Sequence, residues 1–374
     1  MSMSLFKKHV YFDYNATSPL HPYVKDAYIS ALDIYGNPSS VHKSGREARR
    51  HIETARGKIA SYCGVSERHV IFTSSATEAN HLILRGNDCD ALLVPNDEHD
   101  CVLAAAKASG KAIYPIALTE KGLLDEGSFD EALRNCLSKG QKPFMTAMKV
   151  NNETGIIKDL APYAQKIREN GGVFHSDAVQ AIGKLPFDDW AWQCDALTLS
   201  AHKVGGPKGI GCLIIKDNIR SDPLLTGGGQ EMRRRAGTEN IPAIIAFGAF
   251  MDIVNEILQD MSRLSQFKDQ IIKYCHMHVD KVQPLFEDSP IVANTLSLCS
   301  KKTLSEKLVI KADLSSVQLS AGSACSSGKV KESHVLKSYS LGTDIATQTV
   351  RISMGFQNTQ EDIDYFISVA DKIF

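Results

Sequence analysis

The 374-residue sequence lacks several features that define large classes of proteins. It contains no run of eighteen or more apolar residues, so we expect no membrane-spanning segment. Its first fourteen residues, MSMSLFKKHVYFDY, include two lysines but neither an apolar core nor a small-residue cleavage site, which argues against a secretory signal. The formal net charge is only −1, and this balance gives no indication of direct binding to nucleic acid or to an anionic membrane.

The nine cysteines form neither CxxC pairs nor a regular spacing. This pattern argues against a zinc site and against a disulfide framework, so we expect no metal and a reducing, cytoplasmic environment. Most of the thiols are therefore expected to be buried and inert, and a reactive one has to be identified from its neighbours.

The length is sufficient for about two domains. Short apolar strands alternate with helices up to Lys216, which predicts an α/β fold with a mostly parallel, doubly wound sheet in a large domain of residues 15–258. A long helix is expected to start after Gly237-Thr238-Glu239-Asn240 and to run through Ile257. Residues 259–374 mix amphipathic helices with short strands, and we expect them to form a smaller α+β domain together with residues 1–14.

Residues 173–209 contain two apolar runs that are typical of buried strands in a parallel sheet. The first run ends at Asp177, and the second ends at Ser200, directly before His202 and Lys203. A lone lysine at a strand end is usually a surface residue, but a buried one is costly because desolvation disfavours its charge. The combination suits a pyridoxal 5′-phosphate (PLP) site, where the lysine forms a Schiff base, the carboxylate keeps the pyridine nitrogen protonated, and hydroxyl and imidazole groups reach the phosphate.

Further polar residues follow other predicted strands. Ser75 to Thr77 lie at a strand-to-helix turn, where free backbone N–H groups and the helix dipole favour an anion, although Ser75 and Glu78 also match a simple capping box. His99 starts the next helix and Asn152 follows another strand; read alone, each is more typical of a helix start or a turn. Because ligands lie beyond the carboxyl ends of the strands in doubly wound sheets, we expect these residues to meet the lysine there.

Three features of the last third of the chain are candidates for binding or catalysis. Cys325 lies in the loop sequence SAGSACSSG, whose small polar residues fit an accessible reactive thiol as well as an inert loop thiol. Arg351, flanked by apolar residues in VRISMG, is expected to pair with a carboxylate of the protein or of a substrate. The arginines of GGGQEMRRR are either solvated or available to an anion or a partner.

Taken together, the motifs resemble those of the cysteine desulfurases, the NifS/IscS-like group of fold-type I, class V PLP enzymes. The resemblance covers nearly the whole chain, and the GSAC loop is the part that looks specific for sulfur transfer rather than for any class V aminotransferase. The motifs that carry it are YFDYNAT, GNPSSVH, FTSSATEAN, EH, VNNETG, HSDAVQ, SAHKVGGPKGIG, GGGQEMRRRAGTEN, SAGSACSSG and VRISMG.

The resemblance implies a role for each matching residue. Lys203 is then the Schiff-base lysine and the base for the Cα proton, His99 stacks on the cofactor ring and shares in proton transfer, and Cys325 is the nucleophile. The other implied contacts are Asp177 and Gln180 with the pyridine ring; Ala76, Thr77, Ser200, His202 and the neighbouring subunit's Thr238 with the phosphate; Asn152 with cofactor or substrate; and Asn37 and Arg351 with the substrate carboxylate.

The activity implied by the resemblance is the PLP-dependent conversion of L-cysteine to L-alanine, with the sulfur held as a persulfide on Cys325. A homodimer and an iron–sulfur scaffold or other sulfur-acceptor protein are the implied partners. The alternatives are a selenocysteine lyase, another class V lyase or aminotransferase, and a non-catalytic docking platform. The presence of Lys203, Asp177, His99 and Cys325 together argues against the last alternative.

Overall fold

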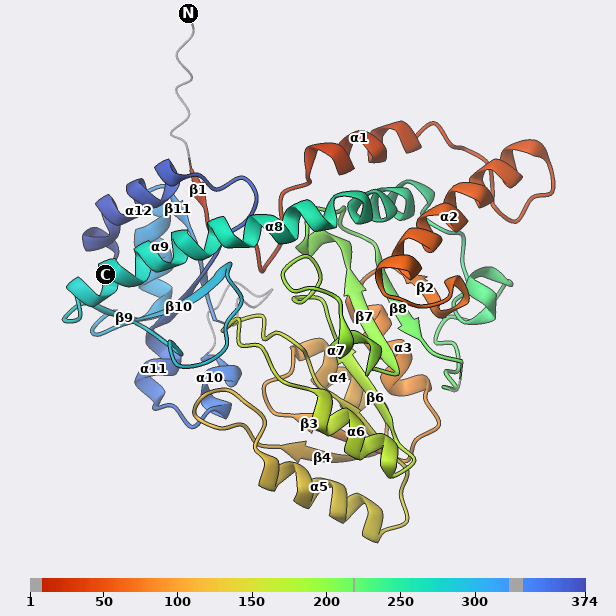
Figure 1. The fold of residues 1–374 in the computed structure, drawn as a ribbon, viewed down its shortest axis with the longest axis horizontal. Coiled ribbons are helices and arrows are strands. Elements are labelled where there is room, and N and C mark those ends of the chain that lie inside the picture. The colour runs from red at the N-terminus through yellow and green to blue at the C-terminus, as the bar shows by residue number, and fades with distance from the viewer. Residues whose placement is uncertain (1–8, 218, 323–331) are drawn as a thin grey trace, which may run out of the picture.

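The structure is a computed structural model that describes residues 9–217, 219–322 and 332–374 (Figure 1). Cys325 lies outside the described residues. The largest sheet has seven strands in the order β2-β8-β7-β6-β5-β3-β4, and only β8 runs antiparallel to its neighbours. The predicted α/β fold with a mostly parallel sheet is therefore confirmed. The strands of this sheet are β2 (Val70–Thr73), β3 (Ala91–Pro95), β4 (Ala112–Ile116), β5 (Pro143–Thr146), β6 (Val173–Asp177), β7 (Ala196–Ser200) and β8 (Gly211–Ile215).

Both faces of the sheet are covered, because alternate residues of each strand point to opposite sides. In β2, Val70 and Phe72 join a core with the helices α2, α5, α6 and α8, whereas Ile71 joins a second core with α3 and α4. In β8, Cys212 and Leu213 separate in the same way. Helical segments of this part of the chain are α1 (Pro22–Ala31), α2 (Lys43–Tyr62), η1 (Glu67–His69), α3 (Ala76–Gly86), α4 (Asp100–Ala108), α5 (Glu126–Ser138), α6 (Ala161–Glu169), α7 (Asp189–Trp192), η2 (Ala201–Lys203) and η3 (Gln230–Arg233).

A third core lies in the smaller part of the molecule, at the left of Figure 1. It joins Val10 and Phe12, from the start of the chain, to the sheet β12-β13-β10-β9 and to the helices of the last hundred residues. Strand β1 pairs in parallel with β11. The elements here are β1 (Val10–Tyr11), β9 (Val282–Pro284), β10 (Thr295–Ser300), α9 (Ser305–Leu314), β11 (Val317–Gln318), β12 (Ser320–Ala321), α10 (His334–Ser338), α11 (Thr343–Gln348), β13 (Thr349–Ser353) and α12 (Gln360–Ile373).

Helix α8 (Ile241–Met277) connects the two parts (Figure 1). Asn240 caps it, and it continues 20 residues beyond the predicted end at Ile257. It does so because its apolar face passes from the first core, at Phe250, to the third core, at Leu264. Its length and composition alone would allow it to cross a membrane, but more than half of its most apolar window (56%) is buried within the molecule. Core packing therefore accounts for its apolar character.

The arginine-rich segment before α8 is held by a buried ion pair. Glu231 accepts two hydrogen bonds from the Arg56 guanidinium, at 2.8 and 2.9 Å, and one from the backbone N–H of Phe72 at 2.8 Å. Glu231, Met232 and Arg233 all have positive φ values, of 45°, 56° and 65°. Residues other than glycine rarely adopt such values because of steric clashes. The ion pair thus fixes a backbone conformation that is unfavourable by itself.

Breaking this buried pair from one side should be strongly destabilising. Arg56→Met leaves the Glu231 carboxylate buried without a cation, and we expect it to lower the free energy of unfolding by about 3–5 kcal/mol. Lys166→Met, which removes a half-exposed pair with Asp130, should cost about 1 kcal/mol or less. Urea unfolding followed by circular dichroism measures the free energy of unfolding of both variants. Equal losses would show that the buried ion pair contributes no more to stability than the half-exposed one.

Candidate active site

A cavity of about 400 Å³ lies where the carboxyl ends of the parallel strands face the smaller part of the molecule. Most of the predicted site residues meet in its wall, although they come from positions 76 to 351 of the sequence. These residues are Ala76, Thr77, His99, Asn152, Asp177, Gln180, His202, Lys203 and Arg351.

Asp177 ends strand β6 and is 7% exposed. Its Oδ2 accepts a hydrogen bond from Asn80 Nδ2 at 2.8 Å, and its Oδ1 accepts one from the backbone N–H of Val179 at 3.0 Å. No cation of the described residues forms an ion pair with this carboxylate. A buried carboxylate without a cation is costly, so the site is complementary to a cationic ligand group.

Lys203 follows β7 in the short helix η2, and its side chain reaches back to the N-terminal segment. Its Nζ donates hydrogen bonds to the backbone carbonyls of Asn15 and Ala16, both at 2.8 Å. Burial, reinforced by the positive charge of Arg351 and opposed by Asp13 and Asp177, lowers the pKa of Lys203 to about 8. A substantial fraction of this amine is therefore neutral, and nucleophilic, near physiological pH.

His99 caps α4 and faces the open cavity. Its Nδ1 accepts a hydrogen bond from the backbone N–H of Cys101 at 3.1 Å, and the Cys101 Sγ lies 3.0 Å from the same nitrogen. The surrounding protein desolvates the ring and lowers the pKa of His99, although Asp177 opposes this effect. The ring is thus neutral at pH 7, with Nδ1 as an acceptor.

The N-terminus of α3 forms one end of the cavity. Ser75 caps the helix by accepting a hydrogen bond from the backbone N–H of Glu78 at 3.2 Å, which confirms half of the predicted capping box. The Glu78 carboxylate binds the N–H of Ser74 and the guanidinium of Arg235 instead of closing the box. A side chain at Gly211 would lie 2.8 Å from the carbonyl carbon of Ser75, so glycine allows this close approach.

Ser200 and His202 lie next to this helix terminus. Ser200 pairs with Gly211 across the sheet; it is not part of the cavity wall, and its buried Oγ has no hydrogen-bond partner among the described residues. His202 does line the cavity, with its Nδ1 at 3.3 Å from Thr17 Oγ1. Burial and the charge of Lys203 lower the pKa of His202 to about 4, so this imidazole is neutral. Hydroxyl, imidazole and helix N–H groups together suit an anion.

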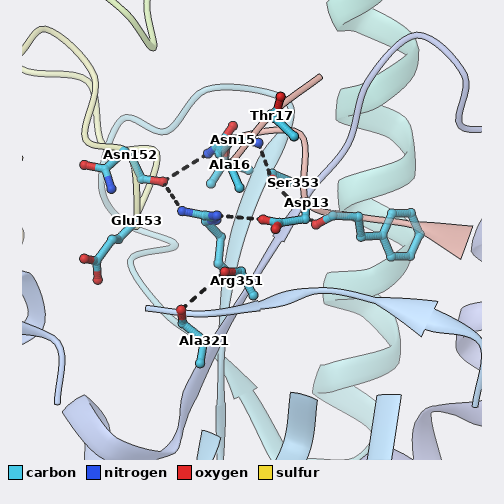
Figure 2. Close-up of polar contacts among 12 residues, drawn as sticks. Asp13, Asn15, Ala16, Thr17, Asn152, Glu153, Ala321, Arg351 and Ser353 are labelled. Atoms are coloured by element: carbon cyan, nitrogen blue, oxygen red, sulfur yellow. Dashed lines mark hydrogen bonds and ion pairs between the residues drawn. The ribbon is translucent and has the colours of Figure 1, made fainter. Parts of the chain in front are cut away.

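Arg351 ends up paired with the protein itself (Figure 2). Its Nη2 lies 2.7 Å from Asp13 Oδ1, and its Nη1 donates to the carbonyl of Asn152 at 2.8 Å. Its Nε and the side-chain oxygen of Asn152 are buried and have no partner within the described part of the chain. A substrate carboxylate at this position would therefore share the guanidinium with Asp13.

Two predicted site residues lie away from the cavity of this chain. Asn37 is exposed in the turn before α2, where its Oδ1 accepts a hydrogen bond from the N–H of Ser39 at 2.9 Å. Thr238 is exposed and lines a separate hollow of about 140 Å³ beside Ser74 and Arg235. Their predicted contacts, and the role of Cys325, stay predictions.

The sequence patterns missed several residues of the cavity. Cys101 was grouped with the inert thiols, yet it lies in the wall beside His99. Asn80, one turn into α3, and Glu153, after Asn152, carried no strand-end signal of their own. Asn15 was not predicted as a site residue, although it forms hydrogen bonds with residues as far along the chain as Ser353.

Comparisons with known proteins agree with this arrangement. The model of the aminotransferase class-V family matches residues 10–366. A cysteine desulfurase IscS of Dictyoglomus turgidum is 33% identical, over 98% of this chain and 95% of that protein. The X-ray structure of a NifS-like protein from Rickettsia africae superposes with a TM-score of 0.86 at 31% identity, over 98% of this chain and 99% of the other. The structure described as SspA in complex with cysteine has a TM-score of 0.78 at 27% identity, over 92% and 99% of the two chains.

The chain belongs to the aminotransferase class-V family, whose model matches nearly its whole length. Within the family, the full-length matches place it in the NifS/IscS-like group of cysteine desulfurases, as the motifs predicted.

The lowered pKa of Lys203 gives a prediction that needs no substrate. Because only the neutral amine reacts, labelling of Lys203 by an amine reagent in the cofactor-free protein should increase with pH around a midpoint near 8, below the ordinary value of 10.5. Arg351→Met removes a nearby positive charge and should raise the midpoint. Mass spectrometry of the Lys203 peptide across pH 6–11 measures both midpoints. An unchanged midpoint in Arg351→Met would contradict the electrostatic explanation.

Proposed function

We propose that the chain binds PLP in this cavity and removes sulfur from L-cysteine, releasing L-alanine. The observation that carries the proposal is the convergence of Lys203, Asp177 and His99 at one sheet edge, beside the free N-terminus of α3. The similarity to cysteine desulfurases over nearly the full chain supports the same activity and favours it over a selenocysteine lyase or another aminotransferase. The cysteine-bound relative supports L-cysteine as the substrate.

The residues fit PLP at both of its ends. Asp177, buried without a cation of the described residues, would hold the protonated pyridine nitrogen. The α3 N-terminus at Ala76 and Thr77, His202 and the unpartnered hydroxyl of Ser200 would hold the phosphate. When bound, PLP withdraws electrons from the substrate and thereby makes the Cα proton acidic and the Cβ–S bond weak.

The chain's own residues supply the remaining chemistry. Lys203 provides a neutral amine that can bond to the cofactor and can accept the Cα proton. His99, neutral and with Nδ1 accepting from the backbone N–H of Cys101, carries its ring proton on Nε2 and can donate it toward the cavity. Arg351 and the side chain of Asn152 would orient the substrate carboxylate. We propose that Asn37 also helps to orient the substrate carboxylate, after movement of the turn before α2.

We assign the sulfur to Cys325 rather than to Cys101. The thiolate of Cys325 would attack the substrate sulfur; a new S–S bond forms, the Cβ–S bond breaks, and its electron pair stays with the carbon skeleton, which is protonated to alanine. Cys101 lines the cavity, but burial and the nearby Asp177 raise the pKa of its thiol to about 12. It therefore remains a thiol, which is a poor nucleophile, at neutral pH.

Incubation with L-cysteine tests this assignment. The PLP-loaded wild type should form alanine and gain one sulfur atom on Cys325, located by mass spectrometry of non-reduced peptides. Cys325→Ala should show no persulfide and should lose at least about 100-fold of its alanine production in multiple turnovers.

Two controls accompany this measurement. Cys101→Ala should keep the persulfide on Cys325, and Lys203→Ala should form no alanine. Sulfur found on Cys101, or undiminished turnover by Cys325→Ala without an added thiol, would overturn the role of Cys325.

We further propose a homodimer in which Thr238 reaches the phosphate site of the partner subunit. Support comes from the exposed apolar side chains of α1 and the following turn: Tyr35 and Val41 are each 87% exposed and Leu32 is 59% exposed. Figure 1 shows the segment between α1 and α2, which carries these residues, on the opposite side of the molecule from the small sheet. Three large apolar side chains exposed within ten residues of the sequence suit a protein interface.

Sedimentation velocity tests the interface. Val41→Asp should shift the wild-type dimer toward monomer at micromolar concentration, because it introduces a charge into an apolar contact. Leu314→Asp is the matched control, since Leu314 is also highly exposed (77%) but lies at the end of α9. Dissociation by Leu314→Asp and not by Val41→Asp would show that the interface includes α9 and would contradict the proposed location.

The cellular setting is also a proposal. We propose a cytoplasmic enzyme, without a membrane or nucleic-acid partner, that passes sulfur to an iron–sulfur scaffold or other acceptor protein. The names of the IscS relatives support the acceptor class. The eight cysteines of the described residues are all free thiols, in keeping with a reducing compartment.

A further inference from the structure

Lys184 is a buried lysine to which the mechanism above assigns no role. It is 7% exposed, and its Nζ donates hydrogen bonds to Asn15 Oδ1, at 2.6 Å, and to Gln180 Oε1. Within residues 9–217, 219–322 and 332–374, no carboxylate forms an ion pair with it. Burial, together with the positive charges of Lys203 and Arg351, lowers the pKa of Lys184 well below its ordinary value, and this cost means that packing alone gives no reason for a lysine here.

Asn15, which accepts from Lys184, uses all of its polar groups. Its backbone N–H donates to Ser353 Oγ at 2.9 Å, and its side-chain amide donates to the carbonyl of Asn152 (Figure 2). The same amide also donates to Thr295 Oγ1. Its own carbonyl accepts from Gln180 Nε2 at 3.0 Å. The residue is 2% exposed. Hydrogen bonds to both parts of the molecule therefore hold Asn15 in place, and its carbonyl oxygen with it.

That carbonyl is one of the two that accept from Lys203. The Nζ of Lys203 lies 2.8 Å from the Asn15 oxygen and 2.8 Å from the Ala16 oxygen. A neutral amine has two N–H groups, and two carbonyls accept both of them. The nitrogen lone pair is then the one direction that remains free.

We propose that Lys184 and Asn15 are positioning residues that hold the Asn15 and Ala16 carbonyls as a cradle for the Lys203 amine whenever it is not bonded to the cofactor. The inference deepens, and rests on, the proposed PLP-dependent function. Lys184 acts through Asn15 and Gln180 and touches neither substrate nor cofactor. The cradle keeps the released amine in one orientation, ready both to act as a base and to bond to the cofactor again.

The rate at which Lys203 bonds to added PLP tests the cradle without any turnover. Cofactor-free wild type, Lys184→Met and Lys149→Met are mixed with PLP, and the absorbance of the Schiff base is followed. Lys149 is the matched control because it is also buried (8% exposed) and donates to a backbone carbonyl, that of Lys158. We expect Lys184→Met to react about tenfold more slowly and Lys149→Met to remain within about twofold of wild type.

A crystal structure of the wild type gives a second test that does not depend on the folding of a variant. The probe is pyridoxyl phosphate joined to cysteine through a saturated C–N bond, which occupies the cavity and leaves Lys203 free. Lys203 Nζ within hydrogen-bond distance of both carbonyls supports the cradle; Nζ elsewhere overturns it.

The two possible failures can be told apart. Normal PLP binding with a wild-type bonding rate in folded Lys184→Met overturns the cradle alone. Failure of wild type to bind PLP overturns the proposed function and the cradle together.

Discussion

The parallel pairing of β5, β6 and β7 is the constraint on which the site depends. Because Asp177 pairs with Thr198 in register, the carboxylate at the end of β6 and the lysine just beyond β7 leave the sheet at the same edge. The antiparallel strand β8 starts at this edge with Gly211, where only glycine lets the α3 N-terminus approach. A one-residue slip would turn each of these side chains to the opposite face.

The N-terminal segment then joins this edge to the smaller part of the molecule. Asp13 binds Arg351, and Asn15 forms hydrogen bonds with residues from five distant segments. The cavity is therefore closed by a stretch that precedes the sheet in the sequence. Asn15 uses all of its polar groups within the protein, whereas two buried atoms of the cavity-lining residues, Arg351 Nε and the side-chain oxygen of Asn152, have no partner among the described residues. Because buried polar groups are normally hydrogen-bonded, the two unpaired atoms indicate where a ligand could bind.

Sequence patterns predicted the sheet and most of the cavity, because strand ends in a doubly wound sheet converge whatever their distance in the chain. They failed where tertiary packing decides. Helix α8 passes Ile257 without a stop because a second core takes over its apolar face, and Glu78 leaves its capping box because Arg235 is close. Cys101 and Asn15 have ordinary sequence surroundings; only the folded chain brings one to His99 and the other to Lys203.

Helix α8 also limits how the protein can move. A continuous helix of 37 residues is about 55 Å long, and here one half is embedded in each core. The small part therefore cannot rotate away from the sheet as a rigid body unless this rod bends. Any widening of the cavity between the two parts therefore has to be accompanied by bending of this one helix.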